Sequence, residues 1–464
     1  MSTRRSFLKT SSAAMLGLSV AGRARRALAD PPPRVGIVGG GLAGVACAWL
    51  LDGTSNTILF ERHPVLGGHA QTIPVTVGGE DLLIDVGAQF FAPGTHPAYV
   101  KLLQLIGLID PAHPDDDETI EADMTIAIAE AGVARPRFVS PAPGRGWPLV
   151  APWNLPALRA FLVFALRARR FEKDGDWLVT VDEWLADLNV PAEPRDGILL
   201  PLVAGLTGCP IEQARGLSAR SALYFIAKGL PAKIWEPLRF SNSLLGLGGN
   251  VLFLAAQCQT LTTHLGSPVT AVLPTATGYQ IRNQDGTAED VDVVVFANPP
   301  YFAAPLLSDI PELAGAAAIL GQFEYFSSEI AIHRDPVYMP AQRRAWSAYN
   351  AEVDGGFCEG SVWYGALRPP APGQEPMSLF KSWATARSEA PQEEVFRQAF
   401  RHPLITPAFI QSGRSLAEHQ GGSGVWFAGS YTSEIDSQET ALTSAMNVVR
   451  QLAPQAPNLL ALGG

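Results

Sequence analysis

The sequence predicts a mixed α/β protein in which a Rossmann-like domain is interrupted by an inserted α+β domain. A strand, a glycine-rich turn, a helix and a second strand follow one another between Val35 and Glu61, which is the order of a parallel βαβ unit. Strand and helix patterns of the same kind return near the C-terminal end. We therefore expect a discontinuous domain over residues 30–98, 240–300 and 405–464, and an inserted domain over residues 99–239 and 301–404.

Composition and charge place the chain among globular proteins. Its 464 residues are 47% apolar and 17% charged, which excludes a largely disordered chain. A net charge of −10 without a basic stripe argues against nucleic acid as a partner. The four cysteines are scattered and form no CxxC pair, so we expect neither a disulfide scaffold nor a metal site.

Residues 1–29 are typical of an export signal rather than of a folded domain. The pair Arg4-Arg5 precedes a modest apolar run, and small residues allow cleavage after Ala29. The pattern resembles a twin-arginine signal, with an ordinary secretory signal or a basic tail as alternatives. It implies passage through the twin-arginine translocase to the periplasm or another extracytoplasmic space. Because that route carries folded proteins, it also suggests a cofactor that is bound before export.

The other elements follow from apolar periodicity and turn residues. The first strand is expected over 35–38, the first helix over 42–51 and the second strand over 57–60. Residues 100–240 are expected to be mostly helical, broken by proline-rich loops. Strand patterns then occupy 269–273, 279–282, 291–296, 323–333, 357–365 and 425–428, and a closing helix runs from about 437 to 452.

The glycine-rich turn is a dinucleotide-binding motif. Gly39, Gly41 and Gly44 form GxGxxG directly after the first strand. The first glycine permits a tight turn, the second lets a pyrophosphate approach the backbone, and the third lets helix and strand pack closely. The N–H groups of Leu42 and Ala43, at the positive end of the helix dipole, are then expected to face the pyrophosphate.

The residues around the end of the second strand distinguish FAD from NAD. Glu61 lies 20 residues past Gly41 and can accept both ribose hydroxyl groups, which favours a cofactor without a 2′-phosphate. A second glycine pair, Gly67-Gly68, offers a second close approach to a diphosphate, for which a NAD domain has no use. The segment from Glu61 to Thr72 resembles the second fingerprint of the flavin-containing amine oxidase superfamily.

This resemblance covers most of the chain after residue 29 and implies a Rossmann-like FAD domain with an inserted substrate domain. It implies non-covalent FAD, because no Cys or His stands at the usual attachment positions. It places the backbone of Val269 at the adenine and residues 428–430 and 438–441 at the flavin. The residues that the motif and the resemblance assign to FAD are Gly39, Gly41, Leu42, Ala43, Gly44, Glu61, Arg62, Gly67, Gly68, His69, Gly87, Ala88, Gln89, Val269, Gly429, Ser430, Glu439, Thr440 and Ala441.

The closing helix carries its own signal. Asp436 and Glu439 fit a capping box, so we expect the helix to begin there. The N–H groups near Thr440 and Ala441 would then face the flavin and stabilise negative charge on its reduced form. The alternative is a plain capped C-terminal helix.

Three positions depart from the family pattern. The resemblance implies Arg after the second glycine pair, Tyr two residues before the Glu of the closing helix, and Lys at the head of the strand near residue 330. This chain has His69, Ser437 and Ser328 there. The departures leave open whether the chain is an oxidase, a dehydrogenase or a desaturase.

Two segments, 67–72 and 333–346, resemble a narrower group of predicted NAD/FAD-binding, amine-oxidase-like proteins with GGHxxT and HxDxxxMPxxRxAW motifs. Some members of that group are thought to act on fatty acyl chains. His333 is a candidate general base, with a structural histidine as the alternative, and Gln89 is the second catalytic candidate. The candidate substrate-binding residues are Phe90, Arg344, Trp346 and Tyr349; a loop anchor is the alternative for the last three.

The function expected from these observations is FAD-dependent oxidation of a C–H bond, in an amine or related small molecule, by hydride transfer to flavin N5. One alternative is a desaturase or oxidase of acyl or isoprenoid chains, and another is a non-catalytic exported flavoprotein. The sequence leaves the electron acceptor open, with O2 and a quinone as the expected candidates. Residues 159–171 mix Phe and Leu with Arg, which predicts either a peripheral membrane contact or a buried helix whose arginines reach the solvent.

Overall fold

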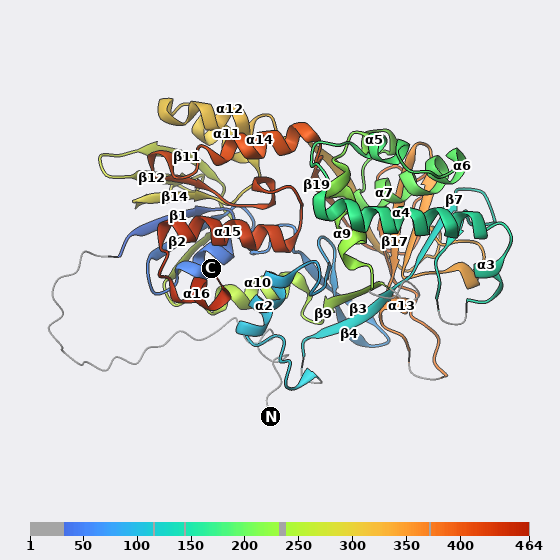
Figure 1. Ribbon diagram of the computed structural model, residues 1–464. Coiled ribbons are helices and arrows are strands. Elements are labelled where there is room, and N and C mark those ends of the chain that lie inside the picture. The colour runs from blue at the N-terminus through green and yellow to red at the C-terminus, as the bar shows by residue number, and fades with distance from the viewer. Residues whose placement is uncertain (1–31, 115–116, 143–144, 232–237, 371–372, 464) are drawn as a thin grey trace. The chain divides into compact units, whose positions relative to one another are not determined.

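A five-stranded parallel sheet organises the beginning and the end of the chain in the computed structural model (Figure 1). The structure describes residues 32–463 except 115–116, 143–144, 232–237 and 371–372. The predicted export signal therefore lies outside the described residues. In spatial order the strands are β10 (Leu261–Leu265), β2 (Asn56–Glu61), β1 (Arg34–Val38), β14 (Val293–Phe296) and β20 (Val425–Phe427). This sheet confirms the predicted Rossmann-like fold.

Helices and a small sheet cover the two faces of this parallel sheet (Figure 1). One face packs on α1 (Leu42–Leu51), α2 (Pro97–Leu105), α10 (Gly246–Ala256), α15 (Gln438–Leu452) and α16 (Pro457–Leu462). The other packs on α11 (Pro300–Leu307), α12 (Ala314–Leu320), α14 (Pro407–Ala417) and the antiparallel strands β11 (Val269–Pro274), β12 (Tyr279–Asn283) and β13 (Ala288–Val291). Helix α1 is buried along its whole length, as expected for a helix covered on both sides.

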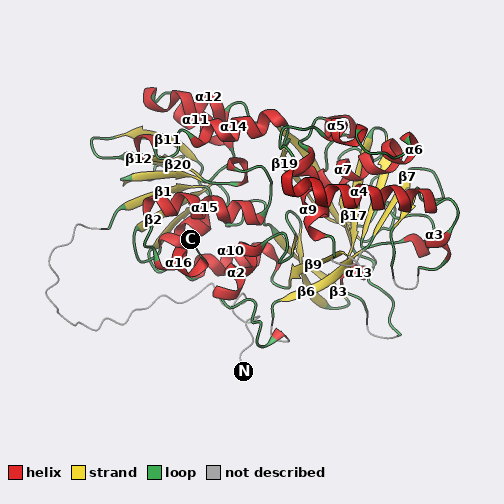
Figure 2. Cartoon of the chain, in the orientation of Figure 1, coloured by secondary structure: helices red, strands yellow, loops and turns green. Residues whose placement is uncertain are grey.

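A seven-stranded mixed sheet forms the second part of the fold (Figure 2). Its strands are β19 (Glu394–Pro403), β15 (Tyr325–His333), β18 (Phe380–Trp383), β17 (Phe357–Trp363), β16 (Tyr349–Asp354), β7 (Ile126–Glu130) and β8 (Phe138–Val139). Its core cluster includes residues of α4 (Leu155–Asp174), α5 (Val181–Ala186), α7 (Leu200–Thr207), α8 (Ile211–Arg215), α9 (Ala219–Gly229) and α13 (Tyr364–Leu367). The short helices α3 (Trp147–Val150) and α6 (Ala192–Pro194) complete the helical region.

The region predicted to be mostly helical also contains strands. The hairpin β3 (Thr72–Val77) and β4 (Glu80–Asp85) stands before it, and β6 (Thr119–Met124) pairs with β9 (Leu238–Ser243), which also pairs with β5 (Phe90–Phe91). Strands β6, β7 and β8 were not predicted within residues 100–240. They are short, and β6 and β7 pair with the distant strands β9 and β16, so a local pattern does not reveal them.

The core clusters do not follow the predicted domain boundaries. Residues 33–464 form one compact unit by their contacts. Helix α2 packs in the same core as α1 and α15, and α11 and α12 pack on the parallel sheet, although both regions fall in the predicted inserted domain. The hairpin β3–β4 instead contributes Val75 and Ile84 to the core of the seven-stranded sheet. Burial of apolar faces, rather than position in the sequence, decides these assignments.

Candidate active site

Two glycine turns lie against each other at the C-terminal end of β1. Gly39 has a left-handed φ of +115°, and the Gly67 N–H donates to the Gly40 carbonyl at 2.9 Å. Gly41 and Gly67 form a parallel bridge. The two predicted glycine fingerprints therefore form one continuous backbone surface. Because glycine has no side chain, this backbone can be approached closely by a ligand.

The space at Gly41 fits a pyrophosphate. A Cβ at Gly41 would meet no protein atom closer than 3.9 Å, whereas a Cβ at Gly44 would lie 2.0 Å from the Gly39 carbonyl oxygen. Gly44 is thus required by packing, and Gly41 borders open space. No side chain caps α1 at Gly41, and its first turn carries no acidic residue. The helix N-terminus is consequently open to an anion next to Leu42 and Ala43.

The side chain of Glu61 is held in place at the end of β2. It is buried, and its two carboxylate oxygens accept the N–H groups of Gly40 at 2.7 Å and His63 at 2.8 Å. Each oxygen retains capacity for a further hydrogen bond, so the carboxylate fits the predicted ribose contact. The neighbouring Arg62 is exposed, and its guanidinium lies 4.7 Å from the centre of the Phe302 ring.

Unpaired polar atoms occur along the predicted path of the dinucleotide. Val269 begins β11 at a bulge and pairs with Asn283, whose buried amide N and O have no partner among the described residues. The buried Oδ1 of Asn298 also lacks a described partner, and the backbone of Asn298 lies against Gly39. Buried polar groups are normally hydrogen-bonded. These atoms therefore fit a site that a bound dinucleotide completes.

The C-terminal flavin segment begins with a tight backbone turn. Gly429 has a φ of +143°, and its N–H donates to Ser444 Oγ at 2.8 Å. The Ser430 hydroxyl donates to Asp436, so Asp436 is not free to cap the closing helix. Ser437 caps α15 instead, in a reciprocal capping box with Thr440. The predicted capping box of Asp436 and Glu439 is therefore wrong.

Glu439 has a different partner from the one expected. Its carboxylate accepts the N–H groups of Ala98 at 3.0 Å and Tyr99 at 2.9 Å, which belong to the first turn of α2. A carboxylate there satisfies unpaired helix donors and the helix dipole. The Thr440 N–H donates to Ser437 Oγ and the Ala441 N–H to the Ser437 carbonyl. Since both N–H groups are occupied within the helix, they are not open to the flavin.

The inner face of the seven-stranded sheet meets these glycine turns. Cross-strand partners share a face, and β15 pairs Phe326 with His402 and Ser328 with Phe400. The His69 ring lies 5.7 Å from the His402 ring and 5.6 Å from the Phe400 ring, measured between centroids. The position where the family pattern has Lys, Ser328, is buried and its hydroxyl has no described partner.

A lysine that the sequence analysis did not single out reaches the same place from β18. Lys381 is buried, and its Nζ donates to the Gly87 carbonyl and, at 3.3 Å, to Gln89 Oε1. The ammonium group has three protons, so one remains for a further acceptor. Lys381 pairs with Ile332 across the sheet, two residues from Ile330 on the same face. A lysine in the apolar run from Leu379 to Trp383 is the local signal that would have found it.

Lys381 is electrostatically linked to Asp85. Burial lowers the pKa of the Lys381 ammonium, which the charge of Asp85 partly offsets. Burial raises the pKa of Asp85, although the Thr72 hydroxyl, at 2.6 Å, and the Leu247 N–H, at 2.8 Å, donate to it. The pKa values of both groups are thus shifted toward neutral pH.

Gln89 connects Lys381 to a polar pocket. Its Nε2 donates to Asn242 Oδ1 at 3.2 Å, and both side chains line a small pocket with Asp85 and Tyr364. The side-chain amide N of Asn242 is buried and lacks a partner among the described residues. The structure therefore brings together Gly87, Gln89 and residues that the sequence analysis missed, whereas Phe90 packs 6.2 Å from the Phe240 ring.

His333, the other catalytic candidate, lies on the opposite face of the sheet. It directly follows Ile332, and successive residues of a strand point to opposite faces. The His333 ring is buried and stacked 5.4 Å from Phe380; its Nδ1 and Nε2 lie 2.7 Å from the Asp335 carbonyl and 2.8 Å from Ser382 Oγ. The structure does not bring His333 to Lys381, and its satisfied ring favours the structural alternative.

The burial of His333 predicts a pH-dependent stability. Burial lowers the pKa of His333 from 6.5 to about 4, so the unfolded chain binds more protons between these values and stability falls as pH decreases through that window. From pH 7.5 to 4.5 the loss due to His333 is about 2.5 kcal/mol. In urea unfolding, the free energy of unfolding of His333→Asn is expected to fall less than that of wild type over this pH range, by the contribution of His333. His113→Asn, at an exposed histidine, should retain it; equal pH slopes in wild type and His333→Asn would contradict the prediction.

The remaining substrate candidates are separated. Trp346 lines an open cavity of about 440 Å³. Arg344 is exposed on a 3-10 turn. Tyr349 is buried, and its hydroxyl donates to the Gly205 carbonyl at 2.6 Å. A binding role for Tyr349 is therefore wrong, because its only polar atom is used within the core.

Comparisons with known proteins agree with this geometry. The model of the family "Flavin containing amine oxidoreductase" matches residues 42–328, which is more than half of the chain. This chain belongs to the flavin-containing amine oxidoreductase family. The enzyme is accordingly an FAD-dependent oxidoreductase, and the predicted cofactor FAD is confirmed. No curated protein matches the sequence.

Solved structures share the fold of this amine oxidoreductase family member at low sequence identity. Cyclohexylamine oxidase from Brevibacterium oxydans is 16% identical, with a TM-score of 0.59 over 91% of this chain and 100% of that chain. Putrescine oxidase bound to putrescine is 14% identical, with a TM-score of 0.61 over 91% and 99%. A fatty acid isomerase from P. acnes, described as producing CLA, is 12% identical, with a TM-score of 0.64 over 91% and 99%.

Proposed function

We propose that the enzyme oxidises a C–H bond of an amine or a related small molecule by hydride transfer to flavin N5. The observation that carries the proposal is the buried Lys381, held at Gly87 and Gln89 and linked to Asp85. Bound FAD would supply the acceptor for the hydride, which carries both electrons. The residues of the chain then have to orient the substrate, exclude water and accept a proton.

Lys381 is suited to hold that proton. An ammonium substrate must lose a proton from its nitrogen before the adjacent C–H bond can give up a hydride. The lowered pKa of Lys381 leaves a neutral fraction near pH 8, and its Nζ can accept the proton while Asp85 balances the charge. The rings of Phe400 and His402 lie beside His69 and form an aromatic wall. The chain has Ser437 at the position where the family pattern has an aromatic Tyr.

A second candidate function is oxidation or desaturation of an acyl or isoprenoid chain. The specific observation in its favour is a set of exposed apolar residues on α3 and α4, next in the chain to Arg145 of the 440 Å³ cavity. A lipid substrate would leave its bilayer through such a surface. In both candidates the flavin is bound non-covalently and the electrons pass to O2 or a quinone.

Anaerobic bleaching of the bound flavin tests the proposal. The purified holoenzyme is mixed with putrescine, cyclohexylamine or benzylamine, and separately with oleic or linoleic acid, while absorbance near 450 nm is followed in a rapid-mixing spectrometer. Bleaching by an amine at a saturating rate supports the proposal. Bleaching only by a fatty acid replaces it with the second candidate. A bound flavin that dithionite reduces but no compound bleaches favours the non-catalytic flavoprotein.

We also propose that the enzyme reaches the periplasm or another extracytoplasmic space through the twin-arginine translocase. The support is the pair Arg4-Arg5 before a modest apolar run, together with an FAD site that must be filled where FAD is made. Replacing both arginines by lysine is expected to leave the FAD-loaded chain in the cytoplasmic fraction. Export at an unchanged level would contradict this route.

A further inference from the structure

The helices α3 and α4 expose a set of large apolar side chains. Trp147 is 63% exposed, Val150 58%, Leu155 52%, Leu162 39% and Leu166 50%. Five of the fifteen large exposed apolar residues among those described fall in this stretch of twenty. Scattered single residues of this kind are normal, whereas a cluster marks a contact surface.

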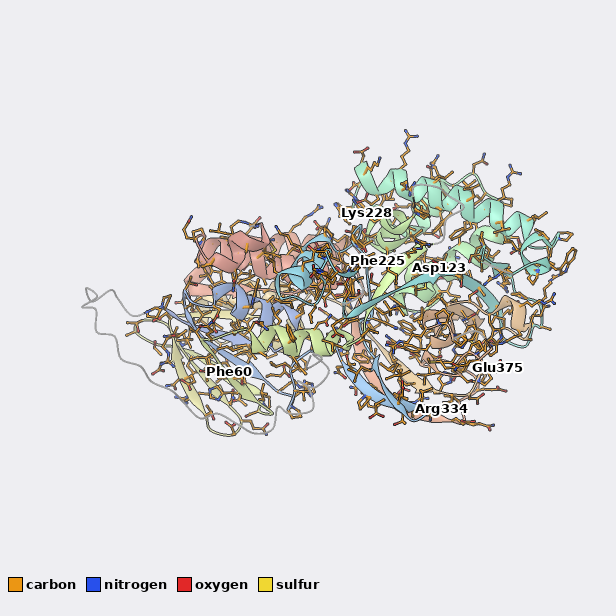
Figure 3. All side chains as sticks on the ribbon, turned by 90° about the horizontal axis from the view of Figure 1, so that it is seen from below. Phe60, Asp123, Phe225, Lys228, Arg334 and Glu375 are labelled. Carbon is orange, nitrogen blue, oxygen red and sulfur yellow. The ribbon has the colours of Figure 1, made fainter. Side chains whose placement is uncertain are left out.

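The three leucines lie on one side of α4. Spacings of seven and four residues place Leu155, Leu162 and Leu166 on the same face of a helix. The opposite face, which includes Phe164 and Ala168, is buried in the core. α4 is therefore packed on one side only, and its solvent side exposes leucines together with charged residues; Figure 3 shows side chains of α4 standing clear of the rest of the chain.

Cations alternate with the exposed leucines along α4. Arg159, Arg170 and Lys173 are exposed on the same side of α4, as their spacing from Leu155 and Leu166 requires. A nearby arginine, Arg167, is paired with Asp187 at 2.7 Å. An exposed helix face that presents Leu together with Arg and Lys fits a helix that lies on the surface of an anionic bilayer. The chain from Asp30 onward has 28 Lys and Arg against 44 Asp and Glu, so it needs such a local surface to overcome repulsion by anionic lipid.

We propose that α3 and the exposed side of α4 dock on the surface of an anionic lipid bilayer. Trp147 would sit at the headgroup level, where its amphipathic ring is favoured, and the three leucines would enter the acyl boundary. The cations Arg159, Arg170 and Lys173 would contact lipid phosphates. None of the described helices is long and apolar enough to cross a membrane, so the contact is peripheral.

The position of the cavity gives this surface a use. Ala142 and Arg145 line the 440 Å³ cavity together with Trp346, and Arg145 lies two residues before Trp147 in the chain. Arg145 is buried, its Nη2 donates to Ser347 Oγ at 2.7 Å, and its buried Nη1 has no described partner. Passage of a lipid through this cavity rests on the second candidate function; docking itself rests only on the exposed surface.

Vesicle flotation tests the docking. The FAD-loaded protein that begins at Asp30 is used, because residues 33–464 form a compact unit and the basic N-terminus is then absent. It is mixed with vesicles of phosphatidylcholine, with or without 30% phosphatidylglycerol, at 0.05 M and 0.5 M NaCl. We expect flotation only with phosphatidylglycerol at low salt, reduced at least tenfold by Leu162→Glu with Leu166→Glu. Leu460→Glu, at a residue 51% exposed on α16, is the matched control and should float as wild type does.

Two further measurements locate the contact and exclude another occupant. Phosphatidylcholine brominated on its acyl chains should quench part of the tryptophan fluorescence, and Trp147→Phe should remove that part. Sedimentation velocity should show the same oligomeric state for wild type and the double leucine variant. The proposal would be overturned if the wild-type protein did not float. It would also be overturned if the double leucine variant still floated and Trp147→Phe still showed the full quenching. A dimer that the leucine substitutions dissociate, without vesicle binding, would assign the surface to a second copy of the chain.

Discussion

Gly41→Val is expected to give a folded protein that purifies with less than about a tenth of the wild-type flavin. Gly41 has a φ of −73°, which valine adopts, and its Cβ would meet no protein atom closer than 3.9 Å. The protein itself therefore tolerates the side chain. The added atoms occupy the approach to the N-terminus of α1, where the pyrophosphate is expected. The ratio of absorbance near 450 nm to that at 280 nm measures the loss.

Two other glycines provide the controls for this prediction. At Gly422 a Cβ would also meet nothing within 4 Å, but the position lies away from the fingerprints, so Gly422→Val should stay fully loaded with flavin. At Gly44 a Cβ would lie 2.0 Å from the Gly39 carbonyl oxygen, so Gly44→Val should be unstable as well as colourless. A Gly41→Val protein as yellow as wild type would move the dinucleotide site elsewhere.

Lys381→Met is expected to slow reoxidation of the dithionite-reduced enzyme by O2 at least tenfold at pH 7. A buried ammonium next to Gly87 stabilises the negative charge that oxygen acquires when it accepts an electron, and removing one such preorganised donor costs about 10²–10³ in rate at other active sites. The assay needs no substrate. Because burial lowers the pKa of Lys381, its charge is lost as pH rises, so the wild-type rate should fall between about pH 7 and 9.

The variant should lack that pH dependence, and this separates charge from packing. Methionine retains the length and apolar body of the lysine side chain but cannot titrate. Lys228→Met is the control variant. It removes a lysine on α9 that pairs with Glu172 at 3.2 Å, and its reoxidation rate and pH profile should equal those of wild type. A Lys381→Met enzyme with the wild-type rate and pH profile would show that Lys381 only anchors Gly87 and Gln89.

The nucleotide half of the site was predictable because its signals are local. Gly39, Gly41 and Gly44 stand at fixed offsets between a strand and a helix, and Glu61 ends the next strand. Backbone geometry at a βα turn depends on the nearest residues, so spacing alone predicts it. The bounds of β1, β2, α1 and α15 agree with prediction to within one or two residues for the same reason.

The catalytic half was not predictable in this way. His333 and Lys381 are both polar residues within apolar strands, and the sequence favoured His333 because it lies in a motif. Which face of a strand meets the cofactor depends on pairing between β15 and β18, which are separated by nearly fifty residues. Long-range register therefore decided that Lys381 points toward Gly87 and His333 away from it.

The sequence by itself determined the fold class, the FAD fingerprints and the family, because each is recorded in short spacings of glycine, strand and acidic residues. Only the tertiary structure decided the roles of the remaining polar groups. It assigned Glu439 to the first turn of α2, linked Lys381 electrostatically to Asp85, and left the leucines of α4 exposed. These outcomes depend on which segments meet when apolar faces are buried, and that is a property of the whole chain rather than of any one segment.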